Sequence, residues 1–445
     1  MAEDTRVAII GLGYVGLPLA VAFSEAGLRV EGIDAAGRRV RELNEGRSPI
    51  EDISDERLAA ALKAGLRVVE VNEAHIAEAD AIVVCVPTPI STTKDPDLGP
   101  VLAAGATVRA SLRPGQLVIL QSTTFPGTTA GPFRQAIEGG GLRAGVDFDL
   151  AYAPERVNPG DPASSSRSVP RLVGGSTPAA TARAAALLRT INDEVVELSS
   201  PDAAELAKLL ENIFRNVNIA LVNNLALLCE RMGLDVWEVI DAAATKPFGF
   251  MRFTPGPGVG GHCIPVDPYY LSWRAREFDF IDRFIELAGD INIGMPRHVV
   301  ELTIDALNDR GRSLNGARIG VIGVAFKPNV GDARNSPAAD VLAGLTARGG
   351  VVAFHDPHVQ SFRDAAGVTR QGQSLDEVLD TSDVVVVLVG HRAVDWERVY
   401  ERAGLIIDTV NSSAGRRTKD HQVRRLGAGW SAASRSESEL ELARA

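Results

Sequence analysis

The chain is poor in cysteine, and this scarcity limits the kinds of protein it can be. Only three cysteines, Cys85, Cys229 and Cys263, occur among 445 residues. They are too few and too widely spaced for a disulfide framework or a zinc site. We therefore expect no bound metal, and we expect the reducing cytoplasm as the compartment.

Excess basic charge and long apolar runs are also lacking. A net charge of −11 argues against a general nucleic-acid or anionic membrane surface, although a local cationic pocket for a phosphate remains possible. No apolar run approaches the roughly 20 residues of a membrane span. The acidic amino-terminal residues lead directly into an expected strand, so no signal peptide is expected. The 45% hydrophobic and 23% charged residues are typical of a globular chain, here long enough for two or three domains.

A dinucleotide-binding fingerprint stands at the beginning of the chain. Residues 6–10 predict a strand, a helix follows to Ala26, and residues 28–33 predict a second strand with Asp34 at its end. Between the first strand and the helix lies a G-x-G-x-x-G segment composed of Gly11, Leu12, Gly13, Tyr14, Val15 and Gly16. Such glycines let a pyrophosphate approach a helix N-terminus, and the acidic residue binds the ribose hydroxyls. The pattern predicts NAD in preference to NADP.

The alternation of strands and helices then continues. Apolar runs at 81–86, 117–121 and 148–152 predict buried strands, and Cys85 is expected to be a core residue. Polar residues follow the three runs, namely Thr88, Thr123 and Glu155. Ligands of open parallel sheets bind beyond the carboxyl ends of the strands, so these side chains are candidates for the cofactor site.

Residues 201–232 predict one long helix. Apolar residues recur at three- and four-residue spacing, and such a helix would be about 48 Å long and cross between domains or subunits. Lys208, Asn212 and Asn216 form a polar stripe at intervals of four residues. The spacing alone favours a solvated face for this stripe.

A glycine- and proline-rich stretch, residues 256–271, predicts a rigid loop rather than a helix or strand. It contains Cys263 and, four residues later, Asp267. Glycines beside a cysteine leave backbone N–H groups free to stabilise a thiolate or an oxyanion. A tight turn with a buried, inert cysteine explains the same stretch, and the pattern does not decide between the two interpretations.

Two helices are expected over 280–292 and 296–308, followed by a second α/β alternation with strands near 317–322, 351–354, 383–389 and 405–408. The predicted fold is therefore α/β, with two Rossmann-like parallel-sheet domains joined by a helical domain with one long central helix. The expected boundaries are 1–199 for the NAD domain, 200–308 for the helical domain, 315–430 for the second α/β domain and 431–445 for a polar tail.

Six motifs, in order, resemble those of the UDP-glucose/GDP-mannose dehydrogenase superfamily over nearly the whole chain. They are the segments Gly11–Gly16, Ser122–Thr128, Pro154–Gly160, Lys208–Asn212, Gly260–Pro268 and Ala325–Pro337. The resemblance is closest to the UDP-N-acetylglucosamine and UDP-N-acetylmannosamine 6-dehydrogenases. It implies an NAD domain, a helical dimerisation domain and a UDP-sugar domain, and hence a homodimer.

The resemblance also implies roles for individual residues. Cys263 is similar to the family's nucleophile, Lys208 and Asn212 to its oxyanion-stabilising pair, Asp267 to the carboxylate beside the cysteine, and Thr123 and Glu155 to the groups that hold a catalytic water. Cofactor contacts are implied for Gly11, Gly13, Tyr14, Val15, Gly16, Asp34, Arg39, Thr88, Thr123 and Arg334. Substrate contacts are implied for Glu155, Arg156, Val157, Lys208, Asn212, Gly260, Gly261, His262 and Lys327.

The substrate branch follows from departures within the family pattern. Pro159 and Val266 stand where UDP-glucose dehydrogenases carry a glutamate and a lysine. With His262 and the segment Lys246–Phe250, they resemble the N-acetylhexosamine branch. Oxidation of a UDP-N-acetylhexosamine at C-6 to the uronic acid is therefore expected, and UDP-glucose 6-dehydrogenase is the alternative. Val410 stands where an arginine that binds the nucleotide sugar is common.

Two other classes compete with this interpretation. A β-hydroxyacid dehydrogenase also joins a dinucleotide domain to a long helix, but it needs neither Cys263 nor the second α/β domain. A non-catalytic regulator on the same scaffold should have lost some of Cys263, Lys208, Asn212 and Asp267, and all four are present.

Overall fold

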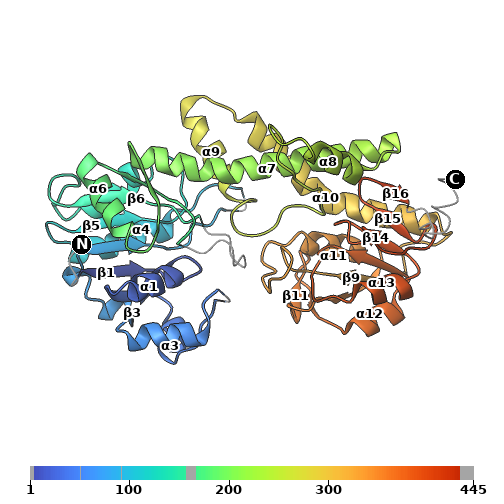
Figure 1. Ribbon diagram of the computed structural model, residues 1–445, viewed down its shortest axis with the longest axis horizontal. Coiled ribbons are helices and arrows are strands. Elements are labelled where there is room, and N and C mark those ends of the chain that lie inside the picture. Colours follow the sequence, from blue (N-terminus) through green and yellow to red (C-terminus); the bar gives the residue numbers. More distant parts are fainter. Residues whose placement is uncertain (1–4, 51, 92, 157–166, 431–445) are drawn as a thin grey trace. The chain divides into compact units, whose positions relative to one another are not determined.

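The computed structural model describes residues 5–430 except 51, 92 and 157–166. The chain forms two compact units. The first comprises Met1–Asn212 with Val266–Ile281, and the second Ile213–Pro265 with Asp282–Ala445. Each unit contains one large sheet and its covering helices (Figure 1).

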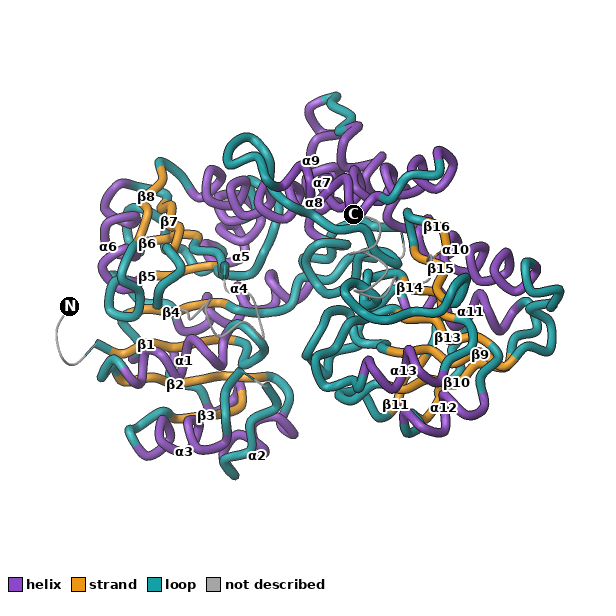
Figure 2. The backbone as a smooth tube through the Cα atoms, turned by 45° about the vertical axis from the view of Figure 1, so that its right-hand side comes forward, coloured by secondary structure: helices purple, strands orange, loops and turns teal. Residues whose placement is uncertain are grey.

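The first unit is built on an eight-stranded sheet in the order β3-β2-β1-β4-β5-β6-β7-β8 (Figure 2). All neighbouring strands are parallel except the antiparallel pair β6–β7. The strands are β1 (Arg6–Ile10), β2 (Arg29–Asp34), β3 (Arg67–Glu70), β4 (Ala81–Val84), β5 (Leu117–Leu120), β6 (Asp149–Tyr152), β7 (Arg171–Gly175) and β8 (Val195–Leu198). The strands expected from apolar runs are confirmed, whereas β3, β7 and β8 were not anticipated. The order 3-2-1-4-5-6 is that of dinucleotide-binding sheets.

Helices cover the sheet of this unit, and its central strands are buried on both faces. Every residue of β4 and β5 is buried, as expected of parallel strands between helical layers. Cys85, directly after β4, is buried in the same core, which confirms its expected place. The helices are α1 (Gly16–Glu25), α2 (Gly37–Asn44), α3 (Asp55–Lys63), α4 (Gly99–Ser111), α5 (Arg134–Glu138) and α6 (Pro178–Leu188).

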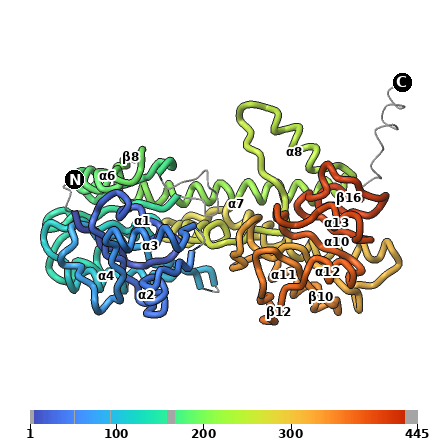
Figure 3. The backbone as a smooth tube through the Cα atoms, turned by 60° about the horizontal axis from the view of Figure 1, so that its bottom comes forward, coloured from blue at the N-terminus to red at the C-terminus, as the bar shows by residue number. Residues whose placement is uncertain are grey.

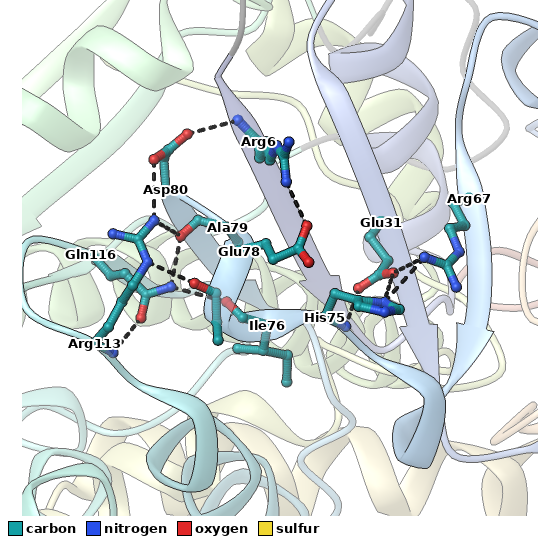
Figure 4. A network of polar contacts seen from close by, with 11 residues as sticks. Arg6, Glu31, Arg67, His75, Ile76, Glu78, Ala79, Asp80, Arg113 and Gln116 are labelled. Carbon is teal, nitrogen blue, oxygen red and sulfur yellow. Dashed lines mark hydrogen bonds and ion pairs between the residues drawn. The ribbon is translucent and has the colours of Figure 1, made fainter.

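Side chains tie together the amino ends of three neighbouring strands (Figure 4). The Arg6 N–H donates to the Asp80 carboxylate at 3.0 Å, and Arg113 Nη2 donates to the same carboxylate at 3.4 Å. Gln116 donates to the carbonyls of Ile76 at 2.9 Å and Ala79 at 2.6 Å. These contacts lie at the edge opposite to the carboxyl ends of the strands. They therefore stabilise the sheet and do not occupy the carboxyl edge, where ligands of parallel sheets bind.

Helix α7 (Pro201–Met232) has the predicted length and runs unbroken from the first unit into the second (Figure 3). Two expectations on the helices that follow are wrong. The expected loop ends at Val266, because α9 (Asp267–Ala275) begins at Asp267 with Pro268 in its first turn, where a missing N–H costs nothing. The two helices expected after it are the single helix α10 (Arg283–Asn308), which continues through Pro296.

The second unit contains α8 (Val236–Ala244), most of α7, α10 and a six-stranded sheet in the order β10-β9-β13-β14-β15-β16. Its strands are β9 (Arg318–Ile322), β10 (Val351–His355), β13 (Val384–Val387), β14 (Ile406–Asp408), β15 (Val423–Arg425) and β16 (Gly429–Trp430), and β11 (Ser361–Arg363) and β12 (Thr369–Gln371) form a separate hairpin. Its sheet helices are α11 (Ala338–Ala347), α12 (Leu375–Thr381) and α13 (Trp396–Arg402). The second Rossmann-like sheet is thus confirmed.

A membrane span is not found in the part of the chain that the structure describes. None of its helices combines sufficient length with sufficient apolar character.

Candidate active site

The turn after β1 has the shape of a pyrophosphate cradle. Gly11 has φ +94°, and a Cβ there would lie 2.6 Å from the Cys85 carbonyl oxygen. A Cβ on Gly16 would lie 1.8 Å from the Gly11 carbonyl oxygen, so the helix N-terminus approaches the turn closely. A Cβ on Gly13 would meet nothing within 4 Å, which leaves open space at the middle glycine. These residues fit an NAD pyrophosphate at the N-terminus of α1, where N–H groups and the helix dipole favour negative charge.

Asp34 ends β2 and is held in a fixed orientation. Its carboxylate accepts hydrogen bonds from the N–H of Leu12 at 2.9 Å and of Ala36 at 2.8 Å, and Arg39 Nη1 lies 3.2 Å away. The carboxylate is buried, whereas Arg39 is half-buried on α2. Asp34 thus ties the glycine turn to β2. Tyr14 is exposed at the turn, and Val15 caps α1.

Thr88, Thr123 and Glu155 follow β4, β5 and β6, which are neighbours in the sheet. The structure therefore brings them to one edge, as their positions in the sequence predicted. Glu155 accepts a hydrogen bond from Gln121 at 3.2 Å and forms an ion pair with Arg171 at 2.9 Å. Arg171 lies on β7 and is buried. No sequence pattern indicated Arg171, because only the antiparallel pairing of β7 with β6 brings it to Glu155.

Arg156, expected to contact substrate, forms an ion pair with Glu211 of α7 at 2.8 Å and donates to the Pro170 carbonyl at 2.6 Å. Val157 and Pro159 lie outside the described residues.

The polar stripe of α7 is buried, so the solvated face that its spacing favoured is wrong. Lys208, Asn212 and Asn216 are exposed by 7%, 0% and 4% respectively. The Asn212 side-chain amide donates to the Asp267 carboxylate at 2.5 Å, and Asp267 is itself buried at the start of α9. A buried amine and buried amides on one helix face are costly unless they are paired. The pairing of Asn212 with Asp267, and of Asn216 with Asn292 at 2.8 Å, offsets part of this cost.

Glu205, one turn before Lys208 on α7, is a polar anchor that no sequence pattern indicated. Its carboxylate accepts hydrogen bonds from the N–H of Gly127 at 2.8 Å, from the N–H and hydroxyl of Thr129 at 2.9 and 2.7 Å, and from the hydroxyl of Thr124 at 3.3 Å. Burial raises the pKa of Glu205 to about 7, although the bonds from Thr129 and Gly127 oppose this rise. Glu205 thereby fixes the loop that carries Thr123.

Helix α9 is attached to the same loops of the first unit. The Tyr270 hydroxyl donates to the Thr88 carbonyl and, at 3.2 Å, to the Pro89 carbonyl. Lys94 Nζ donates to the Tyr269 hydroxyl at 2.8 Å, and Arg274 Nε donates to the Pro126 carbonyl at 3.1 Å. Asp267, at the start of α9, is thus held by the loops that follow β4 and β5.

In the second unit, the glycine-rich loop lies against the segment Ala325–Pro337. A Cβ on Gly260 would meet Phe326, Asn335 and Pro337 at 2.9 Å each, and a Cβ on Gly261 would meet the Phe326 ring at 3.0 Å. The Asn335 amide donates to the Gly261 carbonyl at 3.2 Å. Glycine is therefore required for this close approach.

Cys263 is exposed on that loop, and the residue before it is fixed. His262 Nε2 lies 3.0 Å from the Asp332 carboxylate, and Arg334 donates to the same carboxylate at 2.7 and 2.9 Å. Burial alone would raise the pKa of Asp332, but the hydrogen bonds from His262 and Arg334 outweigh it and hold this pKa well below its usual range. Asp332 was not among the expected site residues, although it belongs to the last of the six motifs.

The expected residues are divided between the two units. Cys263, Gly260, Gly261, His262, Lys327 and Arg334 belong to the second unit, and the other described site residues to the first. Lys327 is half-buried and Arg334 is exposed. Among the described residues, no cluster of histidine, cysteine, aspartate and glutamate could hold a metal ion.

Family models match all three parts of the chain. They are the NAD binding domain of the UDP-glucose/GDP-mannose dehydrogenase family at residues 5–192, its central domain at 202–293 and its UDP binding domain at 320–414. The NAD domain model covers the glycine turn, Asp34 and the strand-end residues described above.

Curated relatives and a solved structure agree with the family models. UDP-N-acetyl-D-mannosamine dehydrogenase of Pyrococcus horikoshii is 37% identical over 91% of this chain and 95% of its own. UDP-N-acetyl-D-glucosamine 6-dehydrogenase of Pseudomonas aeruginosa is 37% identical over 81% of this chain and 84% of its own. The structure of UDP-D-ManNAc dehydrogenase from Pyrococcus horikoshii superposes with a TM-score of 0.86 at 35% identity, covering 96% of this chain and 100% of that one. The chain therefore belongs to the UDP-glucose/GDP-mannose dehydrogenase family and is an NAD-dependent oxidoreductase.

Proposed function

We propose that this enzyme oxidises the C-6 primary alcohol of a UDP-N-acetylhexosamine to the carboxylate through a thioester on Cys263. The buried polar face of α7 carries this proposal. Lys208 and Asn212 are withdrawn from water, and Asn212 is paired with Asp267. Donors held in a dry site can stabilise an oxyanion without reorganising, which suits an alcohol that must lose its proton.

Four electrons must leave the sugar in two steps. NAD held at the glycine turn and by Asp34 would supply the hydride acceptor for each oxidation, so two NAD would be consumed for each sugar. The first oxidation leaves an aldehyde, which carries no hydride that can leave until a nucleophile adds to its carbonyl carbon. The Cys263 thiolate forms a C–S bond there, and the adduct is oxidised to a thioester. Water then cleaves the C–S bond, which releases the acid and returns the thiol.

The chain's polar residues divide the remaining tasks. Lys208 and Asn212 donate hydrogen bonds to the sugar oxygen as negative charge develops on it. Asp267 orients the Asn212 amide. Thr123 and Glu155 hold the hydrolytic water, and the ion pair with Arg171 fixes the Glu155 carboxylate. Asp34 binds the adenosine ribose, and Arg334 and Arg39 contact the cofactor.

Two observations support an amino sugar as the substrate, namely the composition of the glycine-rich loop and the names of the relatives. Val266 removes a charge that UDP-glucose dehydrogenases carry, which leaves a less polar wall for an acetamido methyl group. The two curated relatives described above are named for UDP-N-acetylmannosamine and UDP-N-acetylglucosamine. A pocket that only makes room discriminates by about 1–3 kcal/mol, so some turnover of UDP-glucose is expected.

The decisive measurement is the NADH formed per mole of UDP-sugar consumed, with UDP-N-acetylglucosamine, UDP-N-acetylmannosamine and UDP-glucose compared side by side. We expect two NADH per sugar and a higher kcat/KM for one of the amino sugars. One NADH per sugar would contradict the four-electron reaction. A preference for UDP-glucose over both amino sugars would leave the chemistry intact and overturn the substrate.

We also propose a homodimer built on α7. Between Leu206 and Leu228, five large apolar side chains of this helix are exposed and recur at intervals of four and seven residues, which places them on one face. They are Leu206, Leu210, Phe214, Leu221 and Leu228. An exposed apolar face of this length is typical of a protein–protein interface.

A further inference from the structure

Three buried asparagines connect the two long helices of the second unit to the loop that carries Cys263. They are Asn216 and Asn223 of α7 and Asn292 of α10, exposed by 4%, 0% and 5% respectively. None was singled out from the sequence for this role. Each amide offers one acceptor and two donor positions, and the buried chain of contacts uses both kinds.

The hydrogen bonds run in one direction. The Gly256 N–H donates to Asn223 Oδ1 at 3.0 Å, and Asn223 Nδ2 donates to Asn292 Oδ1 at 2.9 Å. Asn292 Nδ2 then donates to Asn216 Oδ1 at 2.8 Å and to the Asn216 carbonyl at 3.2 Å. The orientation of each amide is therefore fixed by its neighbours. A flipped Asn223 would turn a donor toward the Gly256 N–H and an acceptor toward Asn292 Oδ1.

The backbone of α10 supports the loop at the same place. Pro296 has no N–H to donate to the Asn292 carbonyl, so this oxygen is released from the helical hydrogen-bond pattern. It lies 3.3 Å from the position of a Cβ on Gly258, whose φ is +132°. The loop therefore has two contacts with this region. Gly258 packs against the Asn292 backbone carbonyl, and the Gly256 N–H donates to Asn223, whose amide is oriented by Asn292.

We propose that Asn223, oriented by Asn292 and Asn216, is a positioning residue that sets the path of the loop from Gly256 to Cys263. It holds the amino end of the loop, whereas Asn335 and Asp332 hold Gly261 and His262 next to the cysteine. A segment fixed at both ends presents the thiol in one place. The proposal rests on the proposed role of Cys263 as the nucleophile.

The test replaces Asn223 with aspartate, which has the same shape and keeps an acceptor for the Gly256 N–H. An ionised carboxylate cannot donate to Asn292 Oδ1, so the chain of amides is broken at neutral and higher pH. Asn308→Asp is the matched control. Asn308 is exposed at the last residue of α10, away from the glycine-rich loop in sequence and outside the proposed sites.

We expect kcat of Asn223→Asp at pH 8 to fall by about 10- to 100-fold with KM for the UDP-sugar changed less than about threefold, because misplacing a reacting group costs rate rather than binding. Hydrogen exchange of the Gly256 amide and the rate of Cys263 alkylation should change at the same time. Near pH 6 the defect should shrink, because burial raises the pKa of the new carboxyl and its protonated form donates again. Asn308→Asp should match the parent at both pH values.

The proposal would be overturned if Asn223→Asp had the same Gly256 amide exchange rate and the same kcat as the parent. A lower Tm with an unchanged kcat per folded molecule would also overturn it. If Asn223→Asp does not fold, Asn223→Ser, which buries no charge, takes its place. Failure of both variants to fold would assign the asparagines to stability and also overturn it. Cys263→Ser, assayed in parallel, tests the proposed function separately, because amide exchange does not depend on the role of the thiol.

Discussion

At the scale of single residues, Cys263 differs from the other cysteines because it is exposed, whereas Cys85 and Cys229 are buried. Cys263→Ser should fold with a nearly unchanged Tm, because the side chain is exposed and serine is close to cysteine in size. Net formation of the uronic acid should fall by a factor of about 10³ or more, since a hydroxyl is a far weaker nucleophile than a thiolate. The acid is measured by chromatography after incubation with UDP-sugar and NAD. Acid formation close to the parental rate would exclude the thioester.

Glu205 makes a second residue-scale prediction, on the pH dependence of stability. Its pKa is raised from 4.5 to about 7 in the folded protein, so between these pH values the folded state binds more protons than the unfolded state. The free energy of unfolding should therefore decrease as pH rises through this window, by on the order of 2–3 kcal/mol for this group.

The control is Glu205→Gln, which does not titrate. The difference in unfolding free energy between the parent and this variant, measured by urea denaturation from pH 5 to 8, should shift against the parent as pH rises. A difference that stays constant over this range would show that Glu205 does not titrate there.

At the scale of elements, the glycine-rich loop depends on contact with the segment Ala325–Pro337. Gly260→Ala would place a methyl group 2.9 Å from Phe326, Asn335 and Pro337, two of them through ring or Cβ carbons that cannot easily move. We expect a loss of about 1–3 kcal/mol of stability from overpacking and a drop in kcat of about tenfold or more. Tm and steady-state rates measure both effects.

Gly294→Ala serves as the control for this substitution. Gly294 lies in α10, and a Cβ there meets nothing within 4 Å. Alanine in a helix interior stabilises by up to about 1 kcal/mol relative to glycine, so this variant should be at least as stable as the parent. Equal Tm and kcat values for the two variants would mean that the loop does not depend on its close contact with the segment Ala325–Pro337.

At the scale of the whole molecule, the exposed apolar face of α7 predicts assembly. The 47.2 kDa chain should appear in light scattering at about twice this mass at micromolar concentration. Leu221→Glu puts a charge on this face and should shift the equilibrium toward the monomer. Val146→Glu, at an exposed apolar residue outside α7, should leave the mass unchanged. A parental protein that is monomeric under these conditions would contradict the dimer.

Local patterns in the sequence determined much of the fold. The glycine turn, β1, β2 and the buried strands β4 and β5 were predicted because their signals lie within about 30 consecutive residues and depend on backbone geometry and apolar periodicity. Helix α7 was predicted with the bounds that the structure has, because its apolar spacing persists over 32 residues and no glycine or proline interrupts it. The helices α9 and α10 were misjudged at Pro268 and Pro296, where proline was read as a break although a first turn or a packed helix accommodates it.

Tertiary structure alone decided which polar residues are buried together. Lys208 and Asn212 have the spacing of a solvated face, and only their packing shows that this face is withdrawn from water. Arg171 reaches Glu155 through the pairing of two strands, and Glu205 reaches Thr129 across 76 positions of the chain. Asn223 and Asn292 are 69 positions apart and meet only where two helices pack. Periodicity describes each element by itself, whereas the partners of a buried polar group are set by contacts between elements, and those contacts form only when the chain folds.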